Sequence, residues 1–254
     1  FQPIAPITTK LSWFYARQSW NWMDGIQVSS QFIMNRMHEH GLKKLHHIPL
    51  GVDTDFFHPS KADSNLIQDI KKGEPNRLSI FFPHRFMEEK GLHTLLKAYR
   101  HLCKKLPHDP ALIFAGTGPD IHWVQKAVNM YPHIQYLGFI KSRDEMAKWY
   151  SSCDLGLALS AWETFGLSIL ESMSSGQPMI GANSGAAFEH IQNSGAGFSI
   201  PPGDPSALIQ AITQLPSGLE FQKLRQKARL YASQYSWDNC FHSQLDLYRK
   251  LYNS

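Results

Sequence analysis

The chain has 254 residues, of which 43% are hydrophobic and 18% are charged, as in ordinary globular proteins. This composition excludes disordered, collagen-like and coiled-coil chains, and no run approaches the roughly 20 apolar residues that span a bilayer. Most of the net charge of +4 lies in residues 1–50, which hold five Lys or Arg against two acids. Because this excess is small and no basic stripe accompanies it, we expect no nucleic-acid partner.

The three cysteines, Cys103, Cys153 and Cys240, are widely spaced and odd in number. They form neither a disulfide framework nor a zinc site, which favours a reducing compartment. The chain begins at Phe1 and shows no signal-peptide pattern, so we expect it to be a piece of a longer protein.

Residues 1–47 form an unusual first segment. A first helix is expected, followed by a short strand at 25–28 and a second helix at about 30–40. The segment is also rich in aromatic residues, namely Trp13, Phe14, Tyr15, Trp20 and Trp22. So small a unit cannot bury these rings by itself. It therefore either docks on the rest of the chain or is the last part of a domain that is absent.

From residue 78 onward, short apolar runs alternate with helical stretches. The runs predict strands at 78–82, 111–115, 134–137, 155–159, 178–181 and 197–200. The helical periodicity predicts helices at 92–106 and near 120–130, 142–151, 167–175, 204–215, 219–234 and 237–252. Apolar strands that alternate with helices indicate a parallel sheet covered on both faces. The predicted fold is thus α/β, a Rossmann-like doubly wound sheet, with ligands expected in the turns that follow the strands.

Two of these turns carry candidate ligand groups. Arg85 and Lys90 lie five residues apart after the first strand and could hold a diphosphate, or could form ion pairs with Glu88 and Glu89. After the second strand, residues 116–120 are glycine-rich, which is a weak signal for a ligand-binding turn. They do not form a dinucleotide fingerprint, because Ile121 replaces its third glycine.

The turn after 155–159 places two carboxylates around a predicted helix start. Glu163 precedes the helix and Glu171 lies more than a turn inside it, with the free amides of the helix N-terminus between them. A carboxylate, an anion site and a second carboxylate match the sugar, diphosphate and ribose of a nucleotide-sugar. Alternatively, Glu163 is a favourable helix-terminal charge and Glu171 is a solvated residue.

The stretch 163–171 resembles the E-x7-E motif of the large retaining glycosyltransferase family with the GT-B fold. Other segments resemble that family in the same order, namely 48–53, Arg85 with Lys90, 116–119, 136–139, 153–154, 203–204 and 235–237. The resemblance covers about residues 24–252. It implies that the chain is one half of a GT-B enzyme, the half that holds the donor.

The resemblance also implies roles for individual residues. Arg85 and Lys90 would neutralise the donor diphosphate, Glu163 would hold the transferred sugar, and these three would be the catalytic residues. Glu171 would bind the ribose. The other implied donor-binding residues are Gly116, the base-bordering Phe139 and Ile140, and Phe165, Gly166 and Leu167, which would present backbone amides. The family needs no metal, and we expect no cofactor.

Two segments depart from the family pattern. His84 stands where glycine is usual, and we expect it to be packed or solvent-facing. The loop that often reads Gly-Gly-x-x-Glu appears at 185–189, with Ala186 in place of the second glycine. The thirteen histidines show no metal-ligand spacing and are interpreted as surface residues.

The resemblance predicts three units: a remnant of the N-terminal acceptor domain (1–47), the nucleotide-sugar-binding domain (48–236) and a closing helix (237–254). The predicted activity is transfer of a hexose from GDP-mannose or a UDP-hexose to a glycan or lipid-linked acceptor, with this piece alone inactive. The alternatives are an epimerase of the same fold and an inactive binding module. A phosphorylase-like relative is disfavoured, because 181–199 contains no lysine for pyridoxal phosphate.

The expected partners are the nucleotide-sugar donor, the acceptor and the missing N-terminal domain. The aromatic first segment is compatible with peripheral contact with a membrane, but we expect it to pack against the missing domain and the closing helix. The family's use of cytosolic donors implies a cytoplasmic location, with the inner membrane face as an option.

Overall fold

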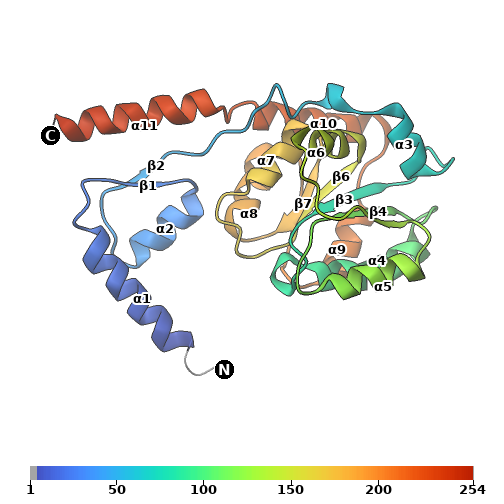
Figure 1. Ribbon diagram of the computed structural model, residues 1–254, viewed down its shortest axis with the longest axis horizontal. Coiled ribbons are helices and arrows are strands. Elements are labelled where there is room, and N and C mark those ends of the chain that lie inside the picture. Colours follow the sequence, from blue (N-terminus) through green and yellow to red (C-terminus); the bar gives the residue numbers. More distant parts are fainter. Residues whose placement is uncertain (1–4, 254) are drawn as a thin grey trace.

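A computed structural model describes residues 5–253, with side chains from residue 8. Residues 1–4 and Ser254 of the predicted terminal units therefore lie outside the described residues. The main unit is a six-stranded parallel sheet in the order β5-β4-β3-β6-β7-β8 (Figure 1). Its strands are β3 (Ser79–Pro83), β4 (Ala111–Ala115), β5 (Ile134–Tyr136), β6 (Leu155–Ala158), β7 (Met179–Ala182) and β8 (Gly197–Ile200). The predicted α/β doubly wound sheet is confirmed.

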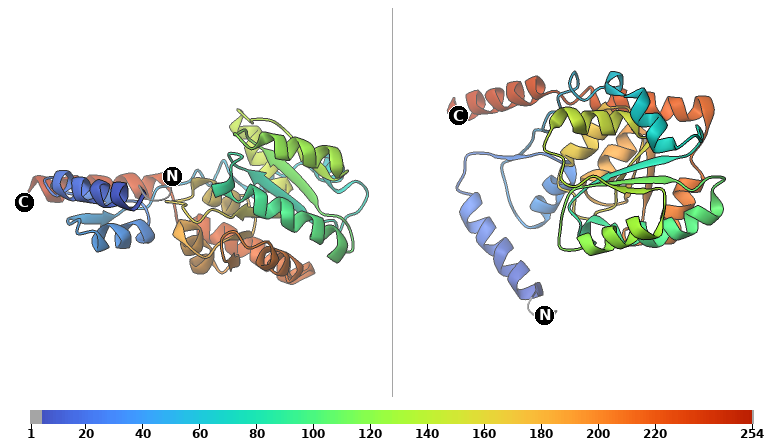
Figure 2. Two further views of the ribbon diagram at one scale, coloured as in Figure 1. Left: turned by 90° about the horizontal axis from the view of Figure 1, so that it is seen from below. Right: turned by 45° about the vertical axis from the view of Figure 1, so that its right-hand side comes forward.

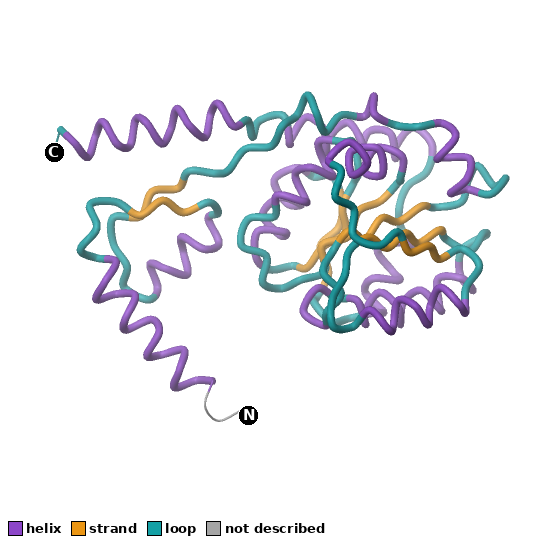
Figure 3. The backbone as a smooth tube through the Cα atoms, viewed as in Figure 1, coloured by secondary structure: helices purple, strands orange, loops and turns teal. Residues whose placement is uncertain are grey.

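Helices cover both faces of this sheet, as the backbone trace in Figure 3 shows. One face carries α4 (Leu92–Lys105), α5 (Ile121–Met130) and α9 (Pro205–Thr213). The other carries α6 (Arg143–Ser152), α7 (Leu167–Ser174), α8 (Gly185–Ser194) and α10 (Gly218–Ala232), with α3 (Ser64–Lys71) beside them.

The two hydrophobic cores follow from the alternation of side chains along the strands. Ile80 and Phe82 of β3 point into the core beneath α4, whereas Phe81 points into the core beneath α6. On α4, apolar residues recur at helical spacing and are fully buried, namely Leu92, Leu95, Tyr99 and Leu102. Because all six strands run parallel, the turns that follow them lie at one edge of the sheet.

The remaining elements lie to one side of the main unit (Figures 1 and 2). They are α1 (Ala5–Trp20), β1 (Ile26–Val28), α2 (Gln31–Glu39), β2 (Leu45–His47) and α11 (Trp237–Tyr252). Strands β1 and β2 pair in parallel, and Gln244 Nε2 of α11 donates to Gln27 Oε1 of β1 at 2.6 Å. The chain thus returns at its C-terminal end to its first elements.

Several elements were not expected from the sequence. They are β2, α3, the 3₁₀ turns η1 (Pro59–Lys61) and η2 (Glu88–Lys90), and α8. The expectation of a loop at 185–189 is wrong, because α8 begins at Gly185. Ala186, which stands in place of the second glycine, is fully buried, and its N–H donates to Glu163 O at 2.8 Å. Small residues let α8 approach the loop after β6 closely.

Candidate functional site

The strand order of the sheet reverses between β3 and β6, which creates a crevice at their carboxyl ends. The loop after β3 carries Arg85 and Lys90, and the loop after β6 carries Glu163. Lys90 Nζ lies 3.2 Å from Glu163 Oε2, although the two residues are 73 positions apart. The interpretation of Arg85 and Lys90 as partners of Glu88 and Glu89 is wrong, since no such ion pair exists among the described residues.

A cavity of about 780 Å³ opens beside this crevice. Its lining residues come from the loops after β3 and β4, from the segment before α6 and from α6 itself. Its lining residues include four of the predicted donor-binding residues, namely Arg85, Gly116, Phe139 and Ile140. Phe139 is 66% exposed, so its ring is available to a ligand. The cavity lies within the size range of small-molecule sites.

Arg85 is an exposed cation at the mouth of this cavity, and it makes no hydrogen bond or ion pair with any described residue. Its neighbour His84 is different. The Nε2 atom of His84 lies 2.7 Å from Leu157 O, and burial lowers the pKa of its imidazole. The expectation that His84 is packed is therefore confirmed, and Arg85 is the charged group that remains for a ligand.

Gly116 allows the loops after β3 and β4 to pack together. Its φ is +128°, and a Cβ added there would lie 2.3 Å from His84 O. Its carbonyl accepts a hydrogen bond from Tyr136 OH at 3.1 Å. The glycine is thus required by the backbone conformation and by the close approach of the neighbouring loop.

The loop after β6 ends at Gly166, which has φ +85° and directly precedes α7. No side chain caps the N-terminus of this helix. By position, the first amides of α7, at Leu167 and Ser168, lack intrahelical acceptors. Phe165 is buried, with its ring 5.4 Å from that of His190. Phe165 therefore offers only its backbone to the crevice, whereas Leu167 is partly exposed.

A buried polar chain that we did not predict from the sequence holds this loop in place. His190 Nε2 lies 2.6 Å from Phe165 O, and His190 Nδ1 lies 3.0 Å from Tyr231 OH. Tyr231 OH lies in turn 2.7 Å from Tyr235 OH. Burial lowers the pKa of His190 to about 4, so its ring is neutral at pH 7. The interpretation of the histidines as surface residues is therefore wrong for His190, which is buried. No local sequence signal links these residues, because they come from α8, α10 and the turn after α10.

Glu171 lies on the second turn of α7, next to α6. Burial raises the pKa of its carboxyl to about 7, although the positive charge of Arg143 and a hydrogen bond with Tyr150 act in the opposite direction. The interpretation of Glu171 as a freely solvated helix residue is therefore wrong. Its carboxyl group is largely desolvated and lies on α7, the helix whose first residues border the crevice. We expect it to titrate near neutral pH.

We expect Glu171→Gln to stabilise the protein at pH 8 by about 1 to 3 kcal/mol and to change stability little at pH 4. The pKa of Glu171 is higher in the folded protein than in the unfolded chain. The folded protein with Glu171 therefore loses stability as the pH rises from about 4.5 through 7. Glutamine stays neutral throughout this range. Urea unfolding at both pH values measures the effect. An equal change at pH 4 and pH 8 would contradict the assignment, and the exposed Glu220→Gln serves as the control.

The first segment also contacts the loop after β6. Ser30 Oγ donates to Thr164 O at 2.6 Å. The carboxylate of Glu189 accepts hydrogen bonds from the N–H groups of Gln31, at 3.2 Å, and of Phe32, both at the start of α2. The first segment thus docks on the rest of the chain, one of the two expected alternatives, and these contacts join it to the candidate site.

Among residues 5–253, no group of three or more His, Cys, Asp or Glu side chains could hold a metal ion. Within the same residues, no helix is both long enough and apolar enough to cross a membrane.

A family described as glycosyl transferases group 1 matches residues 64–234. The chain belongs to this family. It is 31% identical over 199 residues to a GDP-mannose-dependent alpha-(1-6)-phosphatidylinositol dimannoside mannosyltransferase of Mycobacterium tuberculosis, covering 78% of this chain and 50% of the relative. It is 29% identical over 191 residues to a sulfoquinovosyl transferase of Arabidopsis thaliana, covering 74% and 36%. This group 1 chain thus spans about half the length, or less, of these relatives.

Solved structures show the same fold. HepE from Anabaena, in complex with UDP and glucose, superposes with a TM-score of 0.78 at 20% identity and covers 94% of this chain and 67% of its own. Sucrose-phosphate synthase from Thermosynechococcus elongatus superposes with a TM-score of 0.77 at 21% identity, covering 91% and 59%. The Rossmann-like arrangement of this group 1 chain is therefore the one found in GT-B glycosyltransferases.

Proposed function

We propose that this chain is the donor-binding half of a retaining hexosyltransferase. It would bind a nucleotide-diphosphate sugar, GDP-mannose or a UDP-hexose, for transfer of the hexose to a glycan or lipid-linked acceptor. The observation that carries the proposal is the pairing of Lys90 with Glu163 at the switch point of the sheet, beside the cavity at which Arg85 stands without a partner. The Mycobacterium relative uses GDP-mannose by name, and HepE was solved with UDP and glucose, which supports this donor class.

Different residues of the site would bind different parts of the donor. Arg85 and Lys90 would stabilise the negative charge that develops on the leaving nucleoside diphosphate, as a metal does in other transferases. Glu163 would accept hydrogen bonds from the sugar hydroxyls, and the amide of Leu167 at the start of α7 would face the diphosphate. Glu171 would accept from the ribose hydroxyls, and Phe139 and Ile140 would border the base. This division needs no metal and no cofactor.

We further propose the division into units at 1–47, 48–236 and 237–254. The first unit would be the end of an acceptor-binding domain. Several of its large side chains are exposed, including Phe14, Tyr15 and Trp22, the last of which is 88% exposed. Such a set of exposed rings fits a surface that another domain covers. The acceptor site would belong to that domain, so this chain alone would not complete the reaction.

Calorimetric titration of the chain with UDP, GDP and ADP tests the proposal. We expect one nucleotide to bind selectively and Glu171→Ala to weaken that binding about tenfold or more, since hydrogen bonds to a charged group contribute about 1.5 to 3 kcal/mol. The affinity should also rise with pH through about 7 in the native chain, as Glu171 ionises. The control is Glu220→Ala, which removes an exposed carboxylate from α10. Failure of all three nucleotides to bind at millimolar concentration would contradict donor binding by this chain.

A further inference from the structure

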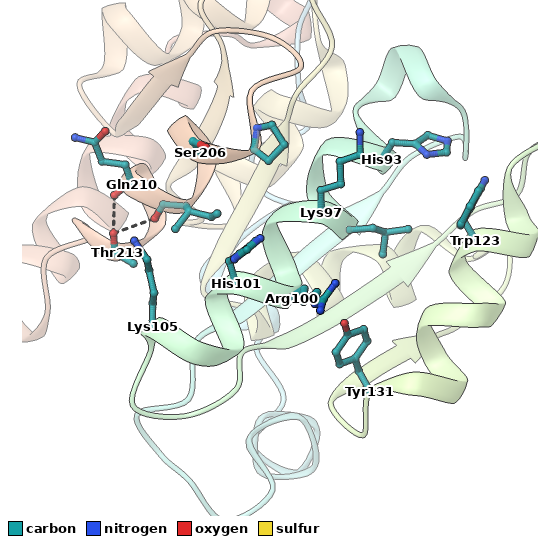
Figure 4. A pocket seen from close by; sticks show the side chains of 13 residues that line it. His93, Lys97, Arg100, His101, Lys105, Trp123, Tyr131, Ser206, Gln210 and Thr213 are labelled. Atoms are coloured by element: carbon teal, nitrogen blue, oxygen red, sulfur yellow. Dashed lines mark hydrogen bonds between the residues drawn. The ribbon is translucent and has the colours of Figure 1, made fainter.

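A second and larger cavity lies on the face of the sheet covered by α4, α5 and α9. It is a groove of about 960 Å³ between these three helices (Figure 4). Its lining residues come from α4, from α5 and the residue after it, and from α9. None of them lines the donor cavity. The proposed transfer chemistry therefore does not account for this groove.

The charge around the groove is of one sign. Helices α4, α5 and α9 together carry five Lys or Arg residues and no Asp or Glu. The net charge of the whole chain is +4, so the rest of the chain has a net charge of −1. The helices that form the groove are thus a second region of positive charge, beside the excess in residues 1–50.

The cations that line the groove lack partners. Lys97, Arg100 and Lys105 are exposed, and within the described residues none of them makes a hydrogen bond or an ion pair. Of the acids near these helices, Asp120 contacts His93 at 3.3 Å, and Asp204 accepts from two amides at the start of α9. Glu88 and Glu89 precede α4 and are exposed. Within residues 8–253, no acid forms an ion pair with any of the three cations.

The floor of the groove is apolar and aromatic. Leu96 of α4 and Ile209 of α9 form its centre, and Tyr131 and Trp123 flank it on the α5 side. Trp123 is 39% exposed and lies beneath Lys126, whose Nζ is 5.6 Å from the ring centroid. Apolar contact and positive charge together are the two contributions that hold a protein at an anionic membrane surface, where Trp and Tyr are also favoured.

We propose that this groove binds the phosphate headgroup of an anionic membrane lipid. Lys97, Arg100 and Lys105 bind the phosphate, and the upper part of the acyl region contacts Leu96 and Trp123. A soluble phosphate compound would use the cations but not this floor. A nucleic acid would need a longer basic track than three helices of this length present. The binding does not depend on the transfer reaction and can be measured without it.

The test is cosedimentation of the chain with phosphatidylcholine vesicles and with vesicles that also contain phosphatidylglycerol. We expect binding only to the anionic vesicles, and weaker binding at high salt. A variant with Lys97→Gln, Arg100→Gln and Lys105→Gln should bind at least tenfold more weakly. The matched control carries Lys148→Gln, Lys223→Gln and Lys227→Gln on α6 and α10, the opposite face of the sheet, and should bind as the unchanged chain does.

Three results would overturn the proposal. If both triple variants lose the same amount of vesicle binding, the net charge of the protein, and not the groove, causes the binding. Unchanged binding of the groove variant would place the contact elsewhere, for example on the exposed aromatic residues of α1. Calorimetric binding of glycerol phosphate or a single-stranded RNA to the groove, as tight as binding to anionic vesicles, would identify a soluble ligand. Circular dichroism of each variant separates loss of folding from loss of binding.

Discussion

Replacing Arg85 with alanine should weaken nucleoside diphosphate binding by about 100-fold. Arg85 is an unpaired cation at the donor cavity, and a hydrogen bond to a charged group contributes about 1.5 to 3 kcal/mol. Because its side chain is exposed and makes no hydrogen bond or ion pair with any described residue, the substitution should leave the stability of the fold unchanged. Calorimetry with the nucleotide that binds the native chain measures the loss, and urea unfolding checks the stability.

Two further variants make this prediction specific. Arg85→Lys keeps the charge but loses the planar, two-pronged donor geometry, so we expect it to recover only part of the affinity. Arg100→Ala removes an equally exposed and unpaired arginine from the other groove and should not affect nucleotide binding. If Arg85→Ala and Arg100→Ala weaken binding equally, the effect of Arg85 is long-range electrostatics rather than contact.

Gly116→Ala should destabilise the fold by about 2 to 4 kcal/mol. A side chain at φ +128° is strained, and the added methyl group would lie 2.3 Å from His84 O, on the backbone that leads to Arg85. The backbone of one loop would have to move, which should also lower nucleotide affinity. Urea unfolding followed by circular dichroism measures the first effect and calorimetry the second.

Gly203→Ala is the matched control for strain alone. Gly203 has φ +76°, but a Cβ there would have no atom within 4 Å. We therefore expect a loss of only about 1 kcal/mol and no change in nucleotide affinity. Equal destabilisation by the two substitutions would show that the close approach of the loops contributes nothing.

The sequence was sufficient for the main sheet because its signals there are local. Each predicted strand is a short apolar run between turn residues, and α4 shows a full helical repeat of leucines. Of the elements it missed, α3 has a clear local signal in its capping residue Asp63, whereas α8 and β2 have weaker local patterns. The start of α8 is rich in small and polar residues, and β2 is three residues long with two histidines. These elements exist because tertiary contacts stabilise them, which no window of sequence displays.

For the site, the sequence by itself determined which chemical groups follow the strands: Arg85, Lys90 and Glu163 in the loops, and Glu171 in the helix after β6. Only the tertiary structure decided how they meet. The reversal of strand order brings Lys90 to Glu163, and burial between α6 and α7 brings the pKa of Glu171 to about 7. The folded chain also gathers the lysines and arginine of α4 around a groove shared with α5 and α9. Local sequence specifies residue type and periodicity, whereas distance and solvent exclusion are properties of the packed chain.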